Sequence, residues 1–140
     1  MDKSVVWYIR MSLAYFFIAS VLGVGMIISP AWVAYYRDVH VHFNLLGWMS
    51  MMIYGVGYHI LPKFSGKHIY SPSIMNIQFW FSNLGLIAMG IAWTMIGREI
   101  SLDTARTLLL AGSIASLTGV ALFVFNIAMT VQEVKRPDVA

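Results

Sequence analysis

Cysteine is absent from all 140 residues. Its absence excludes disulfide bonds, iron–sulfur clusters, zinc sites built on thiolates and covalent haem attachment through a Cys-x-x-Cys-His motif. The sequence also lacks a nucleophile–base pair and a glycine-rich phosphate loop. We therefore expect no independent catalysis, with quinol chemistry left open.

Charge is scarce as well, since only 11% of the residues are charged against about 25% in a soluble domain. Four long stretches carry no Asp, Glu, Lys or Arg, and each is long enough to cross a bilayer core of about 30 Å as a helix. We predict one all-α domain over residues 1–140, a bundle of four transmembrane helices: Val5–Ile28, Val39–Leu61, Ser73–Ile96 and Thr104–Val131. Proton-coupled export usually needs carboxylates inside the membrane, and the predicted spans contain none, which argues against that function.

Short loops separate these spans. Pro30 is predicted to stop the first helix and Pro62 the second, while Ser71 and Pro72 suit the start of the third. Ser101 and Asp103 are predicted to cap the fourth. The first apolar run is longer than the roughly 7–15 residues of a signal-peptide core, so we expect no cleavable signal.

The fourth helix also carries small residues four positions apart, in Gly112-x-x-x-Ser116 and Ala115-x-x-x-Gly119. Such a face lets two helices approach closely. The partner is another helix of this chain or a second copy.

Lys and Arg favour one orientation of the bundle, because cytoplasmic loops are enriched in these residues. The two termini and the second loop would share one side, and they carry six basic residues against three on the other side. We therefore expect both termini in the cytoplasm and an integral protein of a prokaryotic inner membrane. The net charge of +3 is spread over helix ends, which indicates topology and no nucleic-acid partner. The six are Lys3, Arg10, Lys63, Lys67, Lys135 and Arg136, and the three are Arg37, Arg98 and Arg106.

Two histidines, His40 and His42, stand at the mouth of the second predicted span. Ionisable groups at membrane depth are costly and mark functional sites, and imidazole is a common metal ligand. Residues i and i+2 differ by about 200° around a helix, so a regular helix would not let both hold one metal. They would serve two cofactors, or one cofactor and one hydrogen-bond partner. This constraint relaxes if the helix begins only at His42.

Neighbouring residues extend the candidate site. Asn44 lies one turn after His40 on the same face, and Gly47 lies a further turn along. Gly47 leaves room either for a flat macrocycle or for close helix packing. His59 is about 25 Å from His42 along the axis, so it is either a second, separate ligand or an interfacial anchor. His68 lies in a basic loop and is expected to be solvated.

The segment His40-Val-His42-Phe-Asn-Leu-Leu-Gly-Trp48, continuing through Ile53-Tyr-Gly55 to Tyr58-His-Ile-Leu-Pro62, resembles the second membrane helix of haem–copper oxidase subunit I. The match is to the cbb3-type and nitric-oxide-reductase-like branches, and it extends over residues 7–96. Ile77-Gln-Phe-Trp80 and Asn83-Leu-Gly85 resemble the next helix. In that family a histidine at the start of the second helix ligates a low-spin haem. The resemblance implies non-covalent haem b near the outer face, ligated by His40 or His42.

The family's copper, its high-spin haem and the second ligand of its low-spin haem are held on later helices. We therefore expect a haem site without the complete oxygen- or NO-reducing centre. The second axial ligand would be a histidine of a second copy in a homo-oligomer, a methionine (Met26 or Met95), or nothing, which would suit gas or redox sensing. Arg37 or Arg98 would pair with haem propionates or simply mark topology.

Three functions follow from these residues. The first is a b-type cytochrome that exchanges electrons with a respiratory partner or with quinol. The second is a copper-binding assembly factor, in which His40, His42 and nearby methionines bind the metal, because thioethers favour Cu(I). The third is a structural subunit of a respiratory membrane complex.

Overall fold

The computed structural model describes residues 2–131 of the chain. Every regular element in this part is helical, which confirms the all-α prediction for the described residues. The elements are α1 (Lys3–Ile28), α2 (Ala31–His42), the π-helical segment η1 (Phe43–Ser50), α3 (Met51–Phe64), α4 (Pro72–Gly97) and α5 (Leu102–Thr130).

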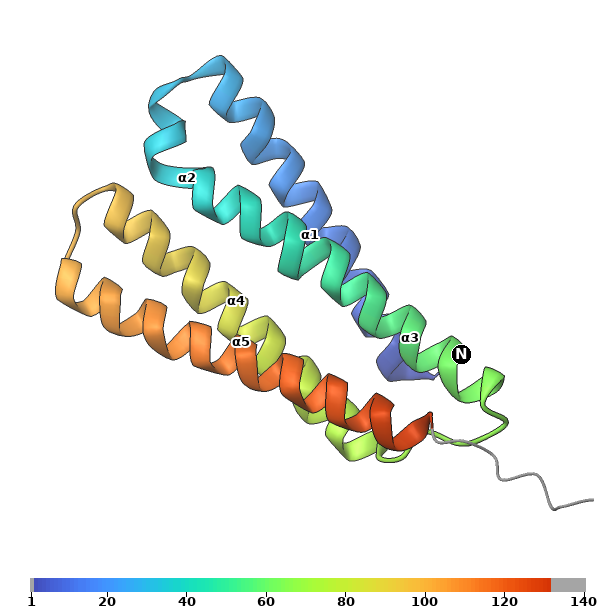
Figure 1. The fold of residues 1–140 in the computed structure, drawn as a ribbon. Helices are drawn as coiled ribbons and strands as arrows, with labels where there is room; N and C mark the ends of the chain where they lie inside the picture. Colours follow the sequence, from blue (N-terminus) through green and yellow to red (C-terminus); the bar gives the residue numbers. More distant parts are fainter. Residues whose placement is uncertain (1, 132–140) are drawn as a thin grey trace, which may run out of the picture.

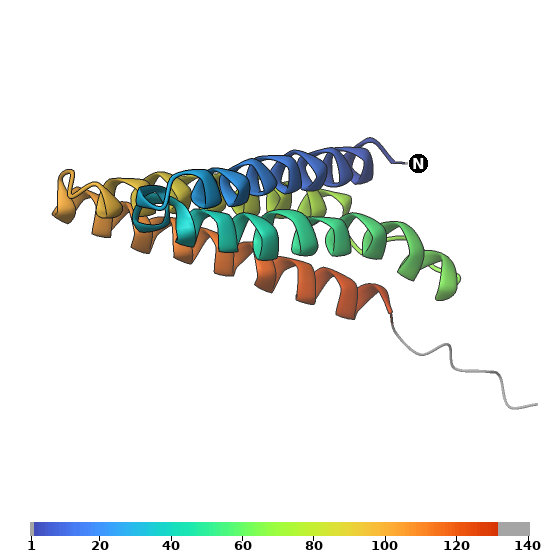
Figure 2. The same cartoon turned by 90° about the horizontal axis from the view of Figure 1, so that it is seen from above.

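The helices form two antiparallel hairpins that pack against each other (Figures 1 and 2). In the first, α1 lies beside the continuous helical segment α2–η1–α3, and in the second, α4 lies beside α5. The hairpins meet because α2 contacts α4 and α3 contacts α5. One end of the bundle holds the start of α1, the α3–α4 connection and the end of α5, and the other end holds the α1–α2 and α4–α5 connections (Figure 1).

The helix ends follow the sequence signals in part. Ser71 caps α4, since its side chain accepts a hydrogen bond from Ile74 N at 3.3 Å, and Pro72 occupies the first turn, as predicted. Pro62 does not stop its helix: it lies inside α3, which continues to Phe64. Ser101 stands at the N-cap of α5, but its left-handed backbone (φ 43°) leaves its side chain without a capping bond.

The second predicted span is longer and less regular than expected. The expected range was Val39–Leu61, but helix begins at Ala31 and runs without interruption through η1 to Phe64. The option of a helix starting at His42 is therefore wrong, because His40 and His42 both lie in the last turn of α2. The π-helical segment begins at the next residue, Phe43. Such segments are rare and occur frequently at functional sites.

The most extensive helix contact in the described part of the chain is between α4 and α5, and glycine allows the two helices to pack closely. A methyl group built on Gly85 would lie 2.7 Å from the carbonyl oxygen of Gly112, and Gly119 lies against the backbone of Ser82. The small-residue face predicted for this helix therefore packs within the chain.

Tyrosines fill much of the interior, and each of three finds a polar partner on another helix. The Tyr8 hydroxyl donates to the carbonyl of Met75 at 2.8 Å. Tyr15 donates to Asn83 Oδ1 at 3.0 Å, and Tyr58 donates to Gln78 Oε1 at 2.6 Å. Because a buried hydroxyl is costly without a partner, these bonds specify how α1 and α3 face α4.

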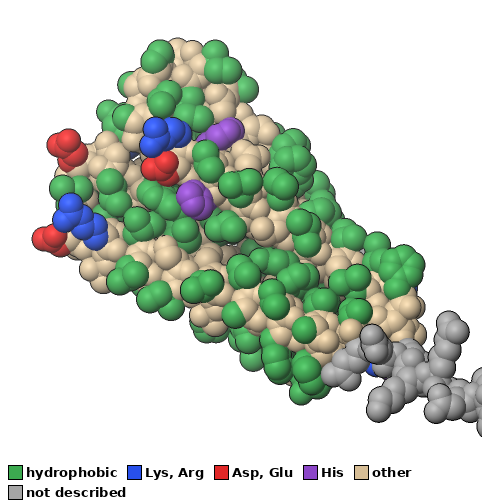
Figure 3. All heavy atoms as spheres, in the orientation of Figure 1, with side chains coloured by type: hydrophobic (Ala, Val, Ile, Leu, Met, Phe, Trp, Pro, Cys, Tyr) green, Lys and Arg blue, Asp and Glu red, His purple; other side chains and the backbone are tan. Residues whose placement is uncertain are grey.

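Three helices, α1, α4 and α5, are long and apolar enough to cross a membrane, judged by length and composition. Figure 3 shows hydrophobic side chains over most of one face, with charged and histidine side chains gathered toward one end. The remaining predicted span corresponds to α2–η1–α3, so the count of four spans stays a prediction. The orientation also stays a prediction, and Lys135 and Arg136, which contributed to it, lie outside the described residues.

Candidate histidine site

His40 points toward α1. Its Nδ1 lies 2.7 Å from the carbonyl oxygen of Ala19, and its ring covers Gly23, where an added methyl group would lie 2.9 Å from His40 Cε1. Glycine at position 23 is therefore what lets the imidazole lie against the helix. The sequence offered no sign of this contact beyond a glycine within an apolar helix.

His42 points toward α4 instead. Its Nδ1 lies 2.9 Å from the carbonyl oxygen of Asp38, one turn earlier in the same helix. Its ring packs on the indole of Trp93, with the ring centres 4.0 Å apart and the planes tilted by 33°. The two imidazoles thus face different neighbouring helices. Trp93, which the sequence analysis did not single out, belongs to the surroundings of His42.

The hydrogen bonds determine which nitrogen of each ring is available. A carbonyl oxygen only accepts, so Nδ1 must donate in both residues. In neutral imidazole, Nε2 then carries the lone pair. A ring that donates Nδ1–H to a backbone carbonyl and offers Nε2 is the arrangement typical of metal-ligating histidines. Both residues are only half-buried.

Asn44 braces the backbone next to His40. Its Nδ2 donates to the His40 carbonyl at 3.0 Å and lies 3.5 Å from His40 Nε2, which is too long for a strong hydrogen bond. The amide therefore makes only a weak hydrogen bond to Nε2 of His40.

Gly47 and the two outer arginines contact residues other than His40 and His42. A methyl group on Gly47 would lie 2.5 Å from Tyr15 Cγ, so the tyrosine ring fills the space beside this glycine. Arg37 is exposed and its Nε lies 3.4 Å from Asp38 Oδ1. Arg98 donates to the Tyr36 hydroxyl at 2.8 Å and also covers the ring of Tyr35.

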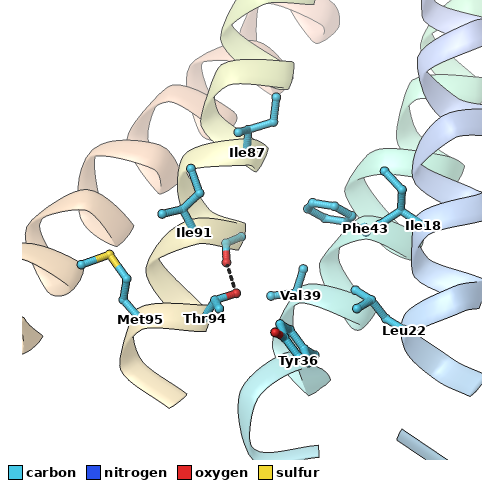
Figure 4. Close-up of a pocket in the computed structure, with 10 residues that line it drawn as sticks. Ile18, Leu22, Tyr36, Val39, Phe43, Ile87, Ile91, Thr94 and Met95 are labelled. Atoms are coloured by element: carbon cyan, nitrogen blue, oxygen red, sulfur yellow. Dashed lines mark hydrogen bonds between the residues drawn. The ribbon is translucent and has the colours of Figure 1, made fainter. Parts of the chain in front are cut away.

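The candidate methionines lie on α1 and α4. Met95 borders a hollow of about 380 Å³ between α4 on one side and α1, α2 and η1 on the other (Figure 4). Val39 and Phe43 line this hollow, but His40 and His42 do not. Met26 lies on α1, three residues after Gly23. His59 lies on α3, with its Nε2 3.0 Å from Lys63 Nζ.

No group of three or more His, Asp or Glu side chains among residues 2–131 is arranged to hold a metal ion. In this part of the chain, α2 therefore offers one imidazole on the side of α1 and one on the side of α4. A haem would need only one such imidazole from this chain, because the macrocycle itself supplies most ligands of the iron.

Comparisons with known proteins give a consistent relationship. The chain is 26% identical to the cytochrome c oxidase subunit 1 homolog of Agrobacterium tumefaciens (strain T37), over 71% of this chain and 23% of that protein. It is 30% identical to the cbb3-type cytochrome c oxidase subunit CcoN1 of Stutzerimonas stutzeri, over 71% of this chain and 24% of that protein. The cytochrome c oxidase subunit 1 of Rhodobacter capsulatus is 30% identical over 41% of this chain.

The resemblance to haem–copper oxidase subunit I is thus a finding of sequence comparison and not only of motifs. The chain spans about a quarter of the length of the first two relatives. No family model matches the chain.

Proposed function

We propose that this chain is a haem-b-binding membrane protein of a respiratory electron-transfer system, with His40 or His42 as an axial ligand of the iron. The observation that carries the proposal is the pair of hydrogen bonds from Nδ1 to the carbonyls of Ala19 and Asp38, which leaves Nε2 for a metal. The similarity to oxidase subunit I supplies haem as the cofactor class.

The surroundings of the histidines limit what else this chain would offer a haem. Tyr15 fills the space beside Gly47, and the hollow between α1, α2 and α4 is lined by neither histidine. His40 or His42 would therefore hold the group. A further ligand would come from a second copy of the chain, from a methionine, from a partner in a respiratory complex, or from none of these.

Bound haem would supply reversible one-electron chemistry, with a potential set by its axial ligands and burial. The residues of this chain would hold the imidazole in one tautomer and one direction, through Ala19 and Gly23 for His40 or through Asp38 and Trp93 for His42. The role of the chain would then be to exchange electrons with a partner protein or a quinol. The chain would lie in an inner membrane with both termini in the cytoplasm.

A pyridine haemochrome assay tests the proposal. The protein is expressed with ample haem, purified in detergent and assayed per chain, together with His40→Ala, His42→Ala and the matched control His68→Ala. We expect haem b in the unaltered protein and in the control, and loss of most haem in one of the two α2 variants.

Haem content that survives the double variant His40→Ala/His42→Ala would rule out both ligands. A colourless protein containing stoichiometric copper would instead indicate the assembly-factor function. If the protein contains neither haem nor copper and a respiratory complex still assembles normally, the chain would be a structural subunit.

A further inference from the structure

A second hollow lies at the end of the bundle opposite to His40 and His42. It has a volume of about 410 Å³ and is formed by the start of α1, the end of α3, the loop that follows and the start of α4. Its lining includes four basic side chains, which are His59, Lys63, Lys67 and His68.

The described lining of this hollow holds one acidic residue, Asp2. Its carboxylate is engaged as the N-cap of α1, where Oδ1 accepts from Ser4 N at 2.8 Å. Basic side chains therefore outnumber acidic ones among the described residues that line the hollow.

Two of the basic groups are held against each other. Lys63 Nζ lies 3.0 Å from His59 Nε2, and this contact is a hydrogen bond only when His59 Nε2 is unprotonated and accepts. An oxyanion beside this pair would accept from the Lys63 ammonium and from a ring N–H of His59. A tetrahedral phosphate has enough acceptor oxygens to serve this pair and a neighbouring base together.

The position of the hollow relative to a bilayer narrows the choice of anion. Both α1 and α4, which are long and apolar enough to cross a membrane, begin at this end. Three aromatic side chains on the segments at this end of the bundle are exposed: Phe64 (83%), Trp7 (53%) and Tyr70 (52%). Exposed aromatics at the ends of membrane helices lie at headgroup level. The hollow is therefore at the depth of lipid phosphates.

We propose that this basic hollow binds the phosphate headgroup of an anionic phospholipid. Lys63 and Lys67 supply charge, while His59 and His68 supply further ring N–H donors. Basic pockets between membrane helices recognise anionic headgroups by the same means.

Native mass spectrometry of the full chain in detergent tests this assignment, with added phosphatidylglycerol or phosphatidylcholine. We expect bound phosphatidylglycerol and little phosphatidylcholine. Lys63→Gln/Lys67→Gln should weaken phosphatidylglycerol binding by about 25-fold, because each basic residue near the headgroup contributes on the order of fivefold. Lys63→Arg/Lys67→Arg should retain binding.

The matched control is Arg98→Gln/Arg106→Gln, which removes the same charge at the other end and should leave binding unchanged. Equal binding of the two lipids, or unchanged binding in the Lys→Gln variant, would overturn the proposal. Displacement of the lipid by millimolar inorganic phosphate would also overturn it, in favour of a site for free phosphate.

Discussion

At the scale of single residues, backbone carbonyls and glycines decide what the candidate side chains do. His40 and His42 have the same chemistry, but Ala19 O and Asp38 O orient them toward different helices. The direction of each ring was partly predictable from the helical spacing of two residues. Which helices would receive them was not, because that depends on how α1 and α4 pack around α2.

Gly47 offers a sharp stability test. Gly47→Ala would bring a methyl group to 2.5 Å from the ring of the buried Tyr15. Overpacking of this kind costs about 1–3 kcal/mol, so we expect a Tm several degrees lower in detergent, followed by tryptophan fluorescence.

Gly57→Ala is the matched control on the same continuous helix. Its added methyl group would meet Phe123 Cζ at an ordinary 3.4 Å, and Ala is a better helix former than Gly by about 1 kcal/mol. We expect an unchanged or higher Tm. Equal effects of the two substitutions would show that Tyr15 does not fill the space beside Gly47.

At the scale of elements, the continuous segment α2–η1–α3 differs most from what sequence patterns predict. Proline usually ends a helix, yet α3 continues two residues beyond Pro62. The π-helical segment Phe43–Ser50 has no local sequence signature, since its apolar residues suit an α-helix equally well. Contacts such as Tyr15 with Phe43, whose ring centres are 5.0 Å apart, belong to the tertiary structure.

The close packing of α4 against α5 depends on glycine. Substitutions at the adjacent positions 111 and 112 of α5 test this dependence. Gly112→Val would drive its side chain into the backbone of α4, because even a methyl group would lie 2.8 Å from the Gly85 carbonyl oxygen. We expect loss of folded monomer in size-exclusion chromatography, or a markedly lower Tm. Ala111→Val, on the exposed face of α5, should behave like the unaltered protein.

If Ala111→Val were the harmful substitution and Gly112→Val were tolerated, the small-residue face of α5 would not be used within the chain. It would then be available to a second copy, which was the other interpretation of the small-residue pattern.

At the scale of the whole molecule, the two ends of the bundle differ in chemistry. One end carries His40, His42 and the outer arginines, and the other carries the basic hollow around Lys63 and Lys67. In the predicted orientation the first end faces outward and the second faces the cytoplasm. A haem at one end and an anionic lipid at the other would then occupy opposite membrane surfaces.

The absence of cysteine makes this orientation testable by single-cysteine labelling. Phe64→Cys and Ile100→Cys place exposed thiols near the two ends. With a membrane-impermeant maleimide we expect Ile100→Cys to react in intact spheroplasts, and Phe64→Cys to react only after permeabilisation. Labelling of both thiols from the same side would exclude the predicted topology.

The sequence by itself determined the helical class and three of the apolar spans, because charge-free runs and helix caps act locally along the chain. It also singled out the histidines and their likeness to oxidase subunit I. Only the tertiary structure decided that α2 extends back to Ala31, that Tyr15 fills the space beside Gly47, and that each imidazole donates Nδ1 to a backbone carbonyl. The physical reason is that ring direction and free space depend on contacts between helices far apart in the sequence, and no local pattern encodes them.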